Sequence, residues 1–243
     1  MKKSILYYSL IMLVLCCTSS CHNDYEDVKA TSLIRGFYNI EKLELRLSHS
    51  DNIYLSVQPY EVYTMMSQKP DDRAYYTKLC ESYQDNNFNK MMTKEEASSY
   101  YSYTFSSIPI RFIDITSNQI FNENHPANTS LKDIVNLLSV SPQKYIQSAY
   151  KTSYNWENIP ENFLKDEDAK RFRYDIYHAN YPIDIKLSEA QNSDFTLLGH
   201  SFQTLGVLIF NEQPTTKGVH EFTVTLTLEN GKSFSASIEK NFE

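Results

Sequence analysis

The chain has 243 residues, a formal net charge of −7 and four cysteines, three of which lie within the first 21 residues. A hydrophobic content of 41% excludes a wholly disordered chain, and a single cysteine beyond residue 21 excludes a scaffold built on intrachain disulfides. The chain is poor in glycine and rich in tyrosine, with 5 Gly, 19 Tyr and one Trp.

The N-terminus has the pattern of a secretory signal peptide. Two lysines precede residues 5–17, an apolar run of 13 residues that is too short to span a membrane as a mature helix. Small residues then lead to Cys21, and a lipoprotein signal peptidase requires small residues before its cysteine. We therefore expect a lipoprotein signal peptide over residues 1–20 and a lipid on Cys21. A secreted protein cleaved near Ser20 and a buried helix are the alternatives, and Cys17 is a second candidate for the lipid.

Acidic residues follow Cys21, and residues 21–32 are expected to form an extended tether because like charges repel. Removing the leader leaves 21 basic and 30 acidic residues, a net charge of −9. A negative protein is poorly suited to nucleic acid and to anionic lipid head groups, which carry the same sign of charge. We therefore expect attachment to the membrane through the lipid and no nucleic acid partner.

The residues after the tether predict a β-hairpin. Two runs alternate apolar and polar residues, the period of half-buried strands, and residues 48–52 form a five-residue loop between them. Pairing the runs across this loop puts every apolar residue on one face, with Leu43 opposite Val57, Leu45 opposite Leu55 and Leu47 opposite Ile53.

Helical signals cluster in the middle of the chain. Pro70 and two aspartates open a segment in which Leu79, Cys80 and Tyr83 share a face with Tyr75 or Tyr76, so Cys80 is expected to be a buried, inert thiol. Weaker signals are a capping box at Thr93 and Glu96, a turn capped by Ser130 and Asp133 and running through Leu138, and Pro160 before the acidic residues 166–168. They predict helical insertions near residues 70–102 and 130–178.

Further strands are expected at residues 108–115, 183–187, 195–198 and 205–210. The last of these shows no alternation, which is typical of a central strand buried on both faces. Asparagine-rich loops at residues 86–89 and 118–128 are expected to form turns, because Asn tolerates left-handed backbone geometry when glycine is scarce.

The C-terminal residues predict a second hairpin. A three-residue loop, 229–231, pairs apolar with apolar residues, whereas a two-residue Asn-Gly loop would pair them with polar ones. We therefore expect a type I turn with Gly231 in the left-handed region. The expected pairs are Leu226 with Phe234, Val224 with Ala236 and Phe222 with Ile238.

Several strands without a regular alternation of helices favour two antiparallel sheets. The predicted fold is mainly β: one antiparallel immunoglobulin-like β-sandwich over residues 33–243 with helical insertions, and an α+β fold as the second choice.

Three parts of the chain carry a resemblance: the leader with Cys21, residues 112–134 and residues 221–238. Together they resemble a family of uncharacterised gut Bacteroidota lipoproteins, in which an Ile-Thr-Ser strand precedes a polar loop with His-Pro and the chain ends in a Thr-rich hairpin. The acidic residues after Cys21 resemble the surface-export signal of such lipoproteins. The resemblance implies an outer-membrane lipoprotein exposed at the cell surface, with a domain of unknown function and no catalytic residues.

One segment has the ligand spacing of an EF-hand calcium loop. Asp85, Asn87, Asn89 and Glu96 match positions 1, 3, 5 and 12, which need oxygen ligands. Lys90 occupies the position where the loop needs glycine, so an asparagine-rich connection is the alternative. Calcium is the one cofactor that the sequence suggests.

Tyr150, Tyr154 and Trp156 lie close together in the sequence and could form an aromatic platform for a sugar; rings that fill the core are the alternative. No nucleophile, phosphate-loop or metalloprotease motif is present. Ser48, His49 and Asp51 have the residue types of a triad, but neighbours in a hairpin loop rarely point at one another, so we expect solvated side chains there. We therefore expect no enzyme. The predicted role is non-catalytic binding or structure at the cell envelope, with an envelope protein as a possible partner, and surface glycan binding is the alternative.

Overall fold

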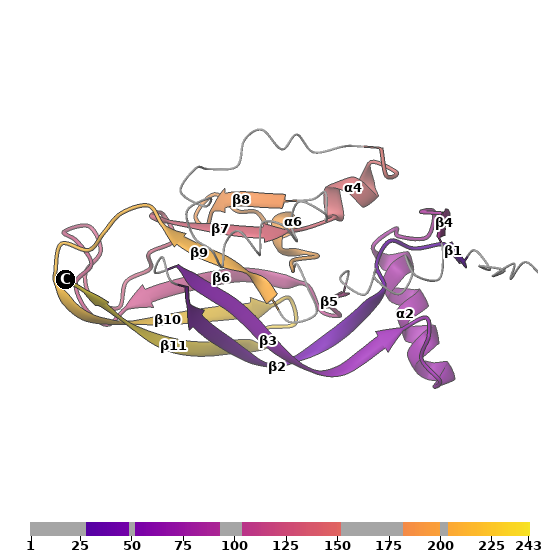
Figure 1. The fold of residues 1–243 in the computed structure, drawn as a ribbon, viewed down its shortest axis with the longest axis horizontal. Helices are drawn as coiled ribbons and strands as arrows, with labels where there is room; N and C mark the ends of the chain where they lie inside the picture. The colour runs from indigo at the N-terminus through magenta and orange to yellow at the C-terminus, as the bar shows by residue number, and fades with distance from the viewer. Residues whose placement is uncertain (1–27, 49–51, 93–103, 152–181, 200–203) are drawn as a thin grey trace, which may run out of the picture.

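The computed structural model describes residues 28–48, 52–92, 104–151, 182–199 and 204–243, and their regular structure is mainly β (Figure 1). The elements in chain order are β1 (Val28–Ala30), β2 (Gly36–Leu47), β3 (Ile53–Thr64), α2 (Pro70–Ser82), β4 (Lys90–Met92), β5 (Thr104–Ser106), β6 (Ile110–Ser117), β7 (Val135–Val140), α4 (Gln143–Gln147), β8 (Pro182–Lys186), α6 (Asn192–Phe195), β9 (Thr204–Phe210), β10 (Gly218–Leu228) and β11 (Ser233–Phe242).

The described strands form three sheets. A six-stranded sheet has the order β5-β2-β3-β9-β7-β8, a three-stranded sheet has the order β11-β10-β6, and β1 pairs with β4. All of these pairs are antiparallel except the short parallel pair of β2 and β5. The mainly β prediction is therefore confirmed.

Both predicted hairpins have the predicted register. Leu45 lies opposite Leu55 in the first hairpin, and Leu226 lies opposite Phe234 in the second. Gly231 has φ +85°, and its N–H donates to the carbonyl oxygen of Leu228 at 2.9 Å, which closes the turn. On the outer face of the second hairpin, threonine and serine hydroxyls pair across the strands at 2.9 Å. This register places the apolar residues on the inner face. It is strongly favoured, because a shift of one residue would turn all of them to solvent.

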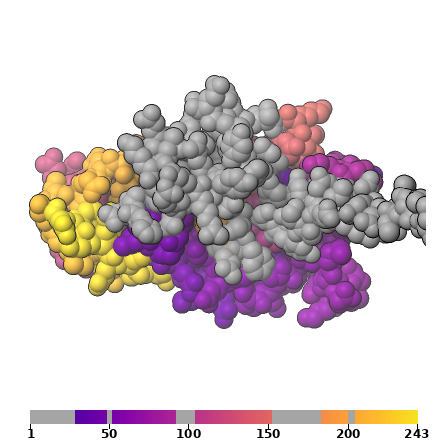
Figure 2. Space-filling model, in the orientation of Figure 1, coloured from indigo at the N-terminus to yellow at the C-terminus, as the bar shows by residue number. Residues whose placement is uncertain are grey.

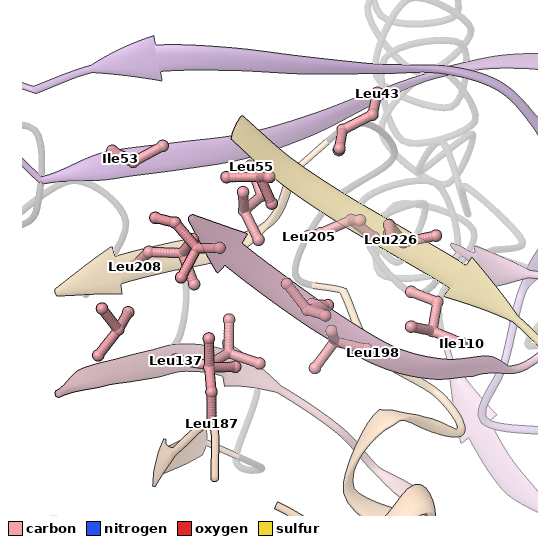
Figure 3. Close-up of a cluster of buried hydrophobic side chains, with 14 of the residues drawn as sticks. Leu43, Ile53, Leu55, Ile110, Leu137, Leu187, Leu198, Leu205, Leu208 and Leu226 are labelled. Atoms are coloured by element: carbon pink, nitrogen blue, oxygen red, sulfur yellow. The ribbon is translucent and has the colours of Figure 1, made fainter. Parts of the chain in front are cut away.

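The two larger sheets contribute side chains to one hydrophobic core. Leu55 from β3, Leu137 from β7 and Leu208 from β9 lie in the same cluster as Ile110 from β6 and Leu226 from β10 (Figure 3). As predicted, β9 is a central strand, bonded to β3 on one side and to β7 on the other. Rings fill one end of this core, where Phe210 and Phe222 lie with their centroids 4.9 Å apart.

A second core covers the other face of the six-stranded sheet. Tyr54, Leu138 and Val207 from that face are clustered with residues of α2 and of the segment before β2. As predicted, α2 begins with Pro70 in its first turn and buries one face, and Tyr76 rather than Tyr75 belongs to that face. The buried residues of α2 and its C-cap are Tyr76, Leu79, Cys80 and Tyr83.

For two segments the sequence predicts the wrong kind of secondary structure. Residues 195–198 are not a strand, because Asn192–Phe195 is a short helix whose Asp194 carboxylate accepts the Gln191 N–H at 3.0 Å. The turn capped by Ser130 and Asp133 does not lead into a helix, because Val135–Val140 is β7 and pairs with two strands.

Three predicted segments also have different boundaries in the structure. Residues 28–32 belong to the fold, since Val28–Ala30 is β1 and Ala30 is buried, so the expected tether 21–32 is too long. The strand expected at 108–115 spans Ile110–Ser117. Within 130–178 the described helical residues are Gln143–Gln147 alone, and the helix signals at 93–96 and 160–168 lie outside the described residues.

Gly206 lies where β9 closely approaches the backbone of β7. A Cβ at this position would lie 2.7 Å from the carbonyl oxygen of Leu138, which is backbone and cannot move aside without moving its strand. We expect Gly206→Ala to lower the free energy of unfolding by about 2 kcal/mol, measured by urea denaturation. Gly231→Asn is the matched control, because Asn tolerates positive φ and a Cβ there meets nothing within 4 Å. An equal effect of the two substitutions would contradict this account.

Candidate functional site

The loop after α2 is held by one buried carboxylate, that of Asp85. Oδ1 accepts the N–H of Leu33 at 2.9 Å, and Oδ2 accepts the N–H of Ile34 at 2.7 Å. Tyr150 donates its hydroxyl to Oδ1 at 2.8 Å. The carboxylate therefore joins the end of α2, the segment before β2 and the segment after α4, which lie far apart in the sequence.

Burial dominates the electrostatics around Asp85. It raises the pKa of the Asp85 carboxyl, while hydrogen bonds from Ile34, Leu33 and Tyr150 oppose that shift. Burial also raises the pKa of the Tyr150 hydroxyl, and the hydrogen bond to Asp85 raises it further. The pKa of the Cys80 thiol rises to about 11, mainly through burial, so this thiol stays protonated at neutral pH, as expected of an inert cysteine.

A hollow of about 350 Å³ lies beside this carboxylate. One wall is the loop after α2, and the other is the end of α4 with the residues that follow it. Polar side chains predominate in the lining, among them four amides, and Tyr150 supplies a ring. The lining includes Gln84, Asn86, Asn87, Gln147 and Tyr150.

The backbone around the hollow is strained. Five residues other than glycine have positive φ in the described chain. Gln84, Ala149 and Tyr150 line the hollow, with φ between 54° and 61°, and Asn89, with φ 49°, follows the lining residue Asn87 by two positions. The fifth, Asn128, confirms with Asn89 that asparagine takes left-handed positions in these loops. Left-handed geometry is costly for residues with a Cβ and persists where surrounding contacts enforce it, as at many binding sites.

The structure places part of the predicted aromatic platform at this hollow. The Tyr150 ring is half-buried and packs edge-on against Phe88, with centroids 5.2 Å apart, and against Tyr145 at 5.6 Å. Tyr154 and Trp156 lie outside the described residues, as does Cys21. The structure thus brings Tyr150 beside Asn87, which the sequence had assigned to a different site.

Asp85, the first ligand in the calcium hypothesis, has a different role in the structure. Both oxygens of Asp85 already accept hydrogen bonds, so calcium binding there would require the carboxylate to leave three donors. Asn87 donates to Asn86 at 2.9 Å, and Glu96 lies outside the described residues. The geometry favours the alternative, an asparagine-rich loop held by a structural aspartate. In the described part of the chain, no three His, Cys, Asp or Glu side chains are grouped to hold a metal ion.

A serine–histidine pair lies elsewhere, in the core. Ser117 Oγ and His220 Nδ1 are 2.9 Å apart, and His220 Nε2 lies 2.8 Å from the carbonyl oxygen of Thr216. This resembles a nucleophile with an oriented base, yet Ser117 and His220 are 2% and 0% exposed. The pair therefore stabilises the start of β10 and offers no access to a substrate.

Sequence reasoning missed the structural use of Asp85 and the role of the two glutamines. An aspartate after a helix gives no signal of burial, because its donors come from residues more than 50 positions away. Gln84 and Gln147 are exposed and follow no pattern in the sequence. Only the meeting of two distant loops makes them neighbours.

No protein-family model matches the chain, and comparison with curated proteins and with solved structures finds no match either. None of the helices among the described residues has the length and apolar character needed to cross a membrane.

Substitution of Asp85 tests whether its buried carboxylate stabilises the fold. We expect Asp85→Ala to lower the free energy of unfolding by about 3 kcal/mol, because two buried N–H groups and one hydroxyl lose their acceptor. Tyr150→Phe removes one of the three bonds and is expected to cost about 1 kcal/mol. Glu239→Ala, an exposed carboxylate on β11, is the control in the same thermal and urea measurements. If Asp85→Ala lowered the free energy of unfolding no more than Glu239→Ala does, this stabilising role of Asp85 would be contradicted.

Proposed function

We propose that the protein is a lipid-anchored lipoprotein of the bacterial cell envelope with a non-catalytic binding role. Support for the anchor comes from the sequence: a short apolar leader, small residues and Cys21. The acidic residues after Cys21 support export to the outer surface. Cys21 precedes β1 by seven residues, so the chain between them reaches at most about 25 Å and keeps the domain close to the membrane.

The binding role rests on the hollow beside Asp85. Its amide side chains are exposed, the loops that carry them are fixed by a buried carboxylate, and strained backbone is concentrated there. Groups with shifted pKa often mark catalytic sites, but at this site burial and structural hydrogen bonds account for the shifts. A fixed polar surface without an available nucleophile suits recognition better than chemistry.

We infer further that the two larger sheets form an immunoglobulin-like sandwich of the constant type. The supporting observation is strand order: β2-β3-β9-β7 corresponds to strands A-B-E-D, and β6-β10-β11 corresponds to C-F-G. In this correspondence α2 belongs to the B–C connection, and α4 and α6 belong to the D–E connection. These two connections meet at the end of a sandwich where such domains carry binding loops.

A neutral carbohydrate is the ligand that the lining favours. Amide groups both donate to and accept from sugar hydroxyls, and an aromatic ring packs against the C–H face of a pyranose. The amides of Gln84, Asn87 and Gln147 and the ring of Tyr150 supply both kinds of contact. An envelope protein partner is the other candidate, and the experiment below separates the two.

Lipidation is tested by labelling in a bacterial host that processes lipoproteins. We expect the full chain to incorporate labelled palmitate and to fractionate with membranes, and Cys21→Ala to lose both properties because the acyl chain has no thiol to join. Cys17→Ala, inside the leader, is the control and should still be labelled. Retention of label and membrane association by Cys21→Ala would refute the anchor.

Carbohydrate binding at the hollow is tested on an array of neutral glycans followed by calorimetry. We expect binding that falls about tenfold or more in the double variant Gln84→Ala/Gln147→Ala, because the sugar hydroxyls lose their amide partners. Gln213→Ala, an exposed glutamine in the loop before β10, is the control. Capture of a stable envelope protein with no glycan binding would favour the protein partner, and glycan binding unchanged in the double variant would reject this site.

A further inference from the structure

A second hollow, of about 260 Å³, lies where the β2–β3 hairpin, α2 and the C-terminal hairpin meet. Figure 2 shows the C-terminal hairpin, in yellow, lying against the indigo and purple surface of the β2–β3 hairpin. Its lining comes from separate elements and includes Asn39 of β2, Tyr60 of β3, Tyr75 of α2, Ser107 after β5, and Asn230 and Lys232 of the turn between β10 and β11.

Two tyrosine rings are presented to solvent at this hollow. Tyr60 is 54% exposed and Tyr75 is 37% exposed, high fractions for aromatic side chains. Tyr75 packs edge-on against Tyr63, with centroids 4.7 Å apart and an interplanar angle of 77°. The position of its ring is thereby set before any ligand arrives.

Hydrogen bonds fix the floor of the hollow and support Tyr63. Tyr63 donates its hydroxyl to Glu61 at 2.7 Å, and Asn39 Nδ2 donates to the Tyr63 hydroxyl at 2.9 Å and to Glu61. Ser107 donates its hydroxyl to Asn39 Oδ1. Both bonds to Glu61 use its Oε2, and neither Glu61 nor Glu229 lines the hollow.

The groups left for a ligand are mainly donors. Lys232 is the one lining residue with a full charge at neutral pH; its Nζ lies 4.7 Å from the centre of the Phe234 ring, and no described carboxylate is within ion-pair distance. Asn230 uses Oδ1 to accept the Lys232 N–H at 3.0 Å, and its Nδ2 has no partner among the described residues. The hydroxyls of Tyr60 and Tyr75 likewise have no hydrogen-bond partner there.

We propose that this second hollow binds an acidic carbohydrate, with the Tyr60 ring against the C–H face of a pyranose and Lys232 paired with its carboxylate or sulfate group. Exposed rings, several free donors and one cation without an ion-pair partner match such a ligand. Drug-sized sites run to about 300–1,000 Å³, so this smaller hollow suits a single sugar residue at the end or within a chain. None of these side chains lines the first hollow, so variants of the two hollows test the two sites independently.

The experiment uses the mature full chain on an array of uronic acid and sulfated glycans together with their neutral counterparts, followed by calorimetry with the strongest acidic oligosaccharide. We expect binding to acidic glycans that weakens about tenfold or more in Tyr60→Ala and in Lys232→Gln and that falls as salt rises. Comparison of uronic acid with sulfated glycans distinguishes the two sources of negative charge.

Matched variants separate this site from general charge and from the first hollow. Lys217→Gln removes an exposed lysine that directly precedes β10 and lines neither hollow, and Phe112→Ala removes an exposed ring from β6. Both variants should bind as the parent does. The variant Gln84→Ala/Gln147→Ala should also retain acidic glycan binding. No binding to any acidic glycan, equal binding to the neutral counterparts, or unchanged binding by Lys232→Gln with an unchanged melting temperature would overturn the proposal, as would a protein partner lost in Tyr60→Ala.

Discussion

The carboxylate of Asp85 accepts hydrogen bonds from two backbone N–H groups and from a tyrosine hydroxyl, and it does so out of contact with water. A buried carboxylate is unfavourable unless each oxygen has a donor, so this side chain holds three parts of the chain at fixed positions. The segment before β2, the loop after α2 and the residues after α4 are arranged around it. The first hollow exists because these loops are kept together.

The sheets explain why those loops meet at one end of the molecule. The six-stranded sheet is covered on one face by the core that it shares with the three-stranded sheet, and on the other by α2 and the segment before β2. The chain between β3 and β6 and the chain between β7 and β9 then leave the sheets close to each other (Figure 1). The turn between β10 and β11 meets α2 and the β2–β3 hairpin, and the second hollow forms there. Rigid strands that carry variable loops are a common basis for recognition.

The excess of tyrosine has more than one explanation in the structure. Tyr38 and Tyr76 are buried and fill the two cores, and Tyr150 completes the hydrogen bonds of Asp85. Tyr60 and Tyr75 remain at the surface beside a polar hollow. Tyrosine suits both environments because its ring packs with apolar groups while its hydroxyl keeps a polar end. Scarcity of glycine has a visible cost, since Asn89 and Asn128 take left-handed positions that glycine would occupy without strain.

The sequence by itself determined the hairpins, the helix at Pro70–Ser82 and the central position of β9, because these depend on periodicity, turn length and helix-start residues that lie next to one another. It also predicts the leader and Cys21. It could not determine that Phe195 ends a helix or that Val135–Val140 is a strand, since local capping decides the first and pairing with distant strands decides the second. The tertiary structure alone decided that Asp85 is a buried acceptor, that Tyr150 lies beside Asn87, and that Lys232 lies on a hollow with Tyr60. Each of these depends on residues that the chain brings together from far apart, and single-sequence patterns carry no record of such contacts.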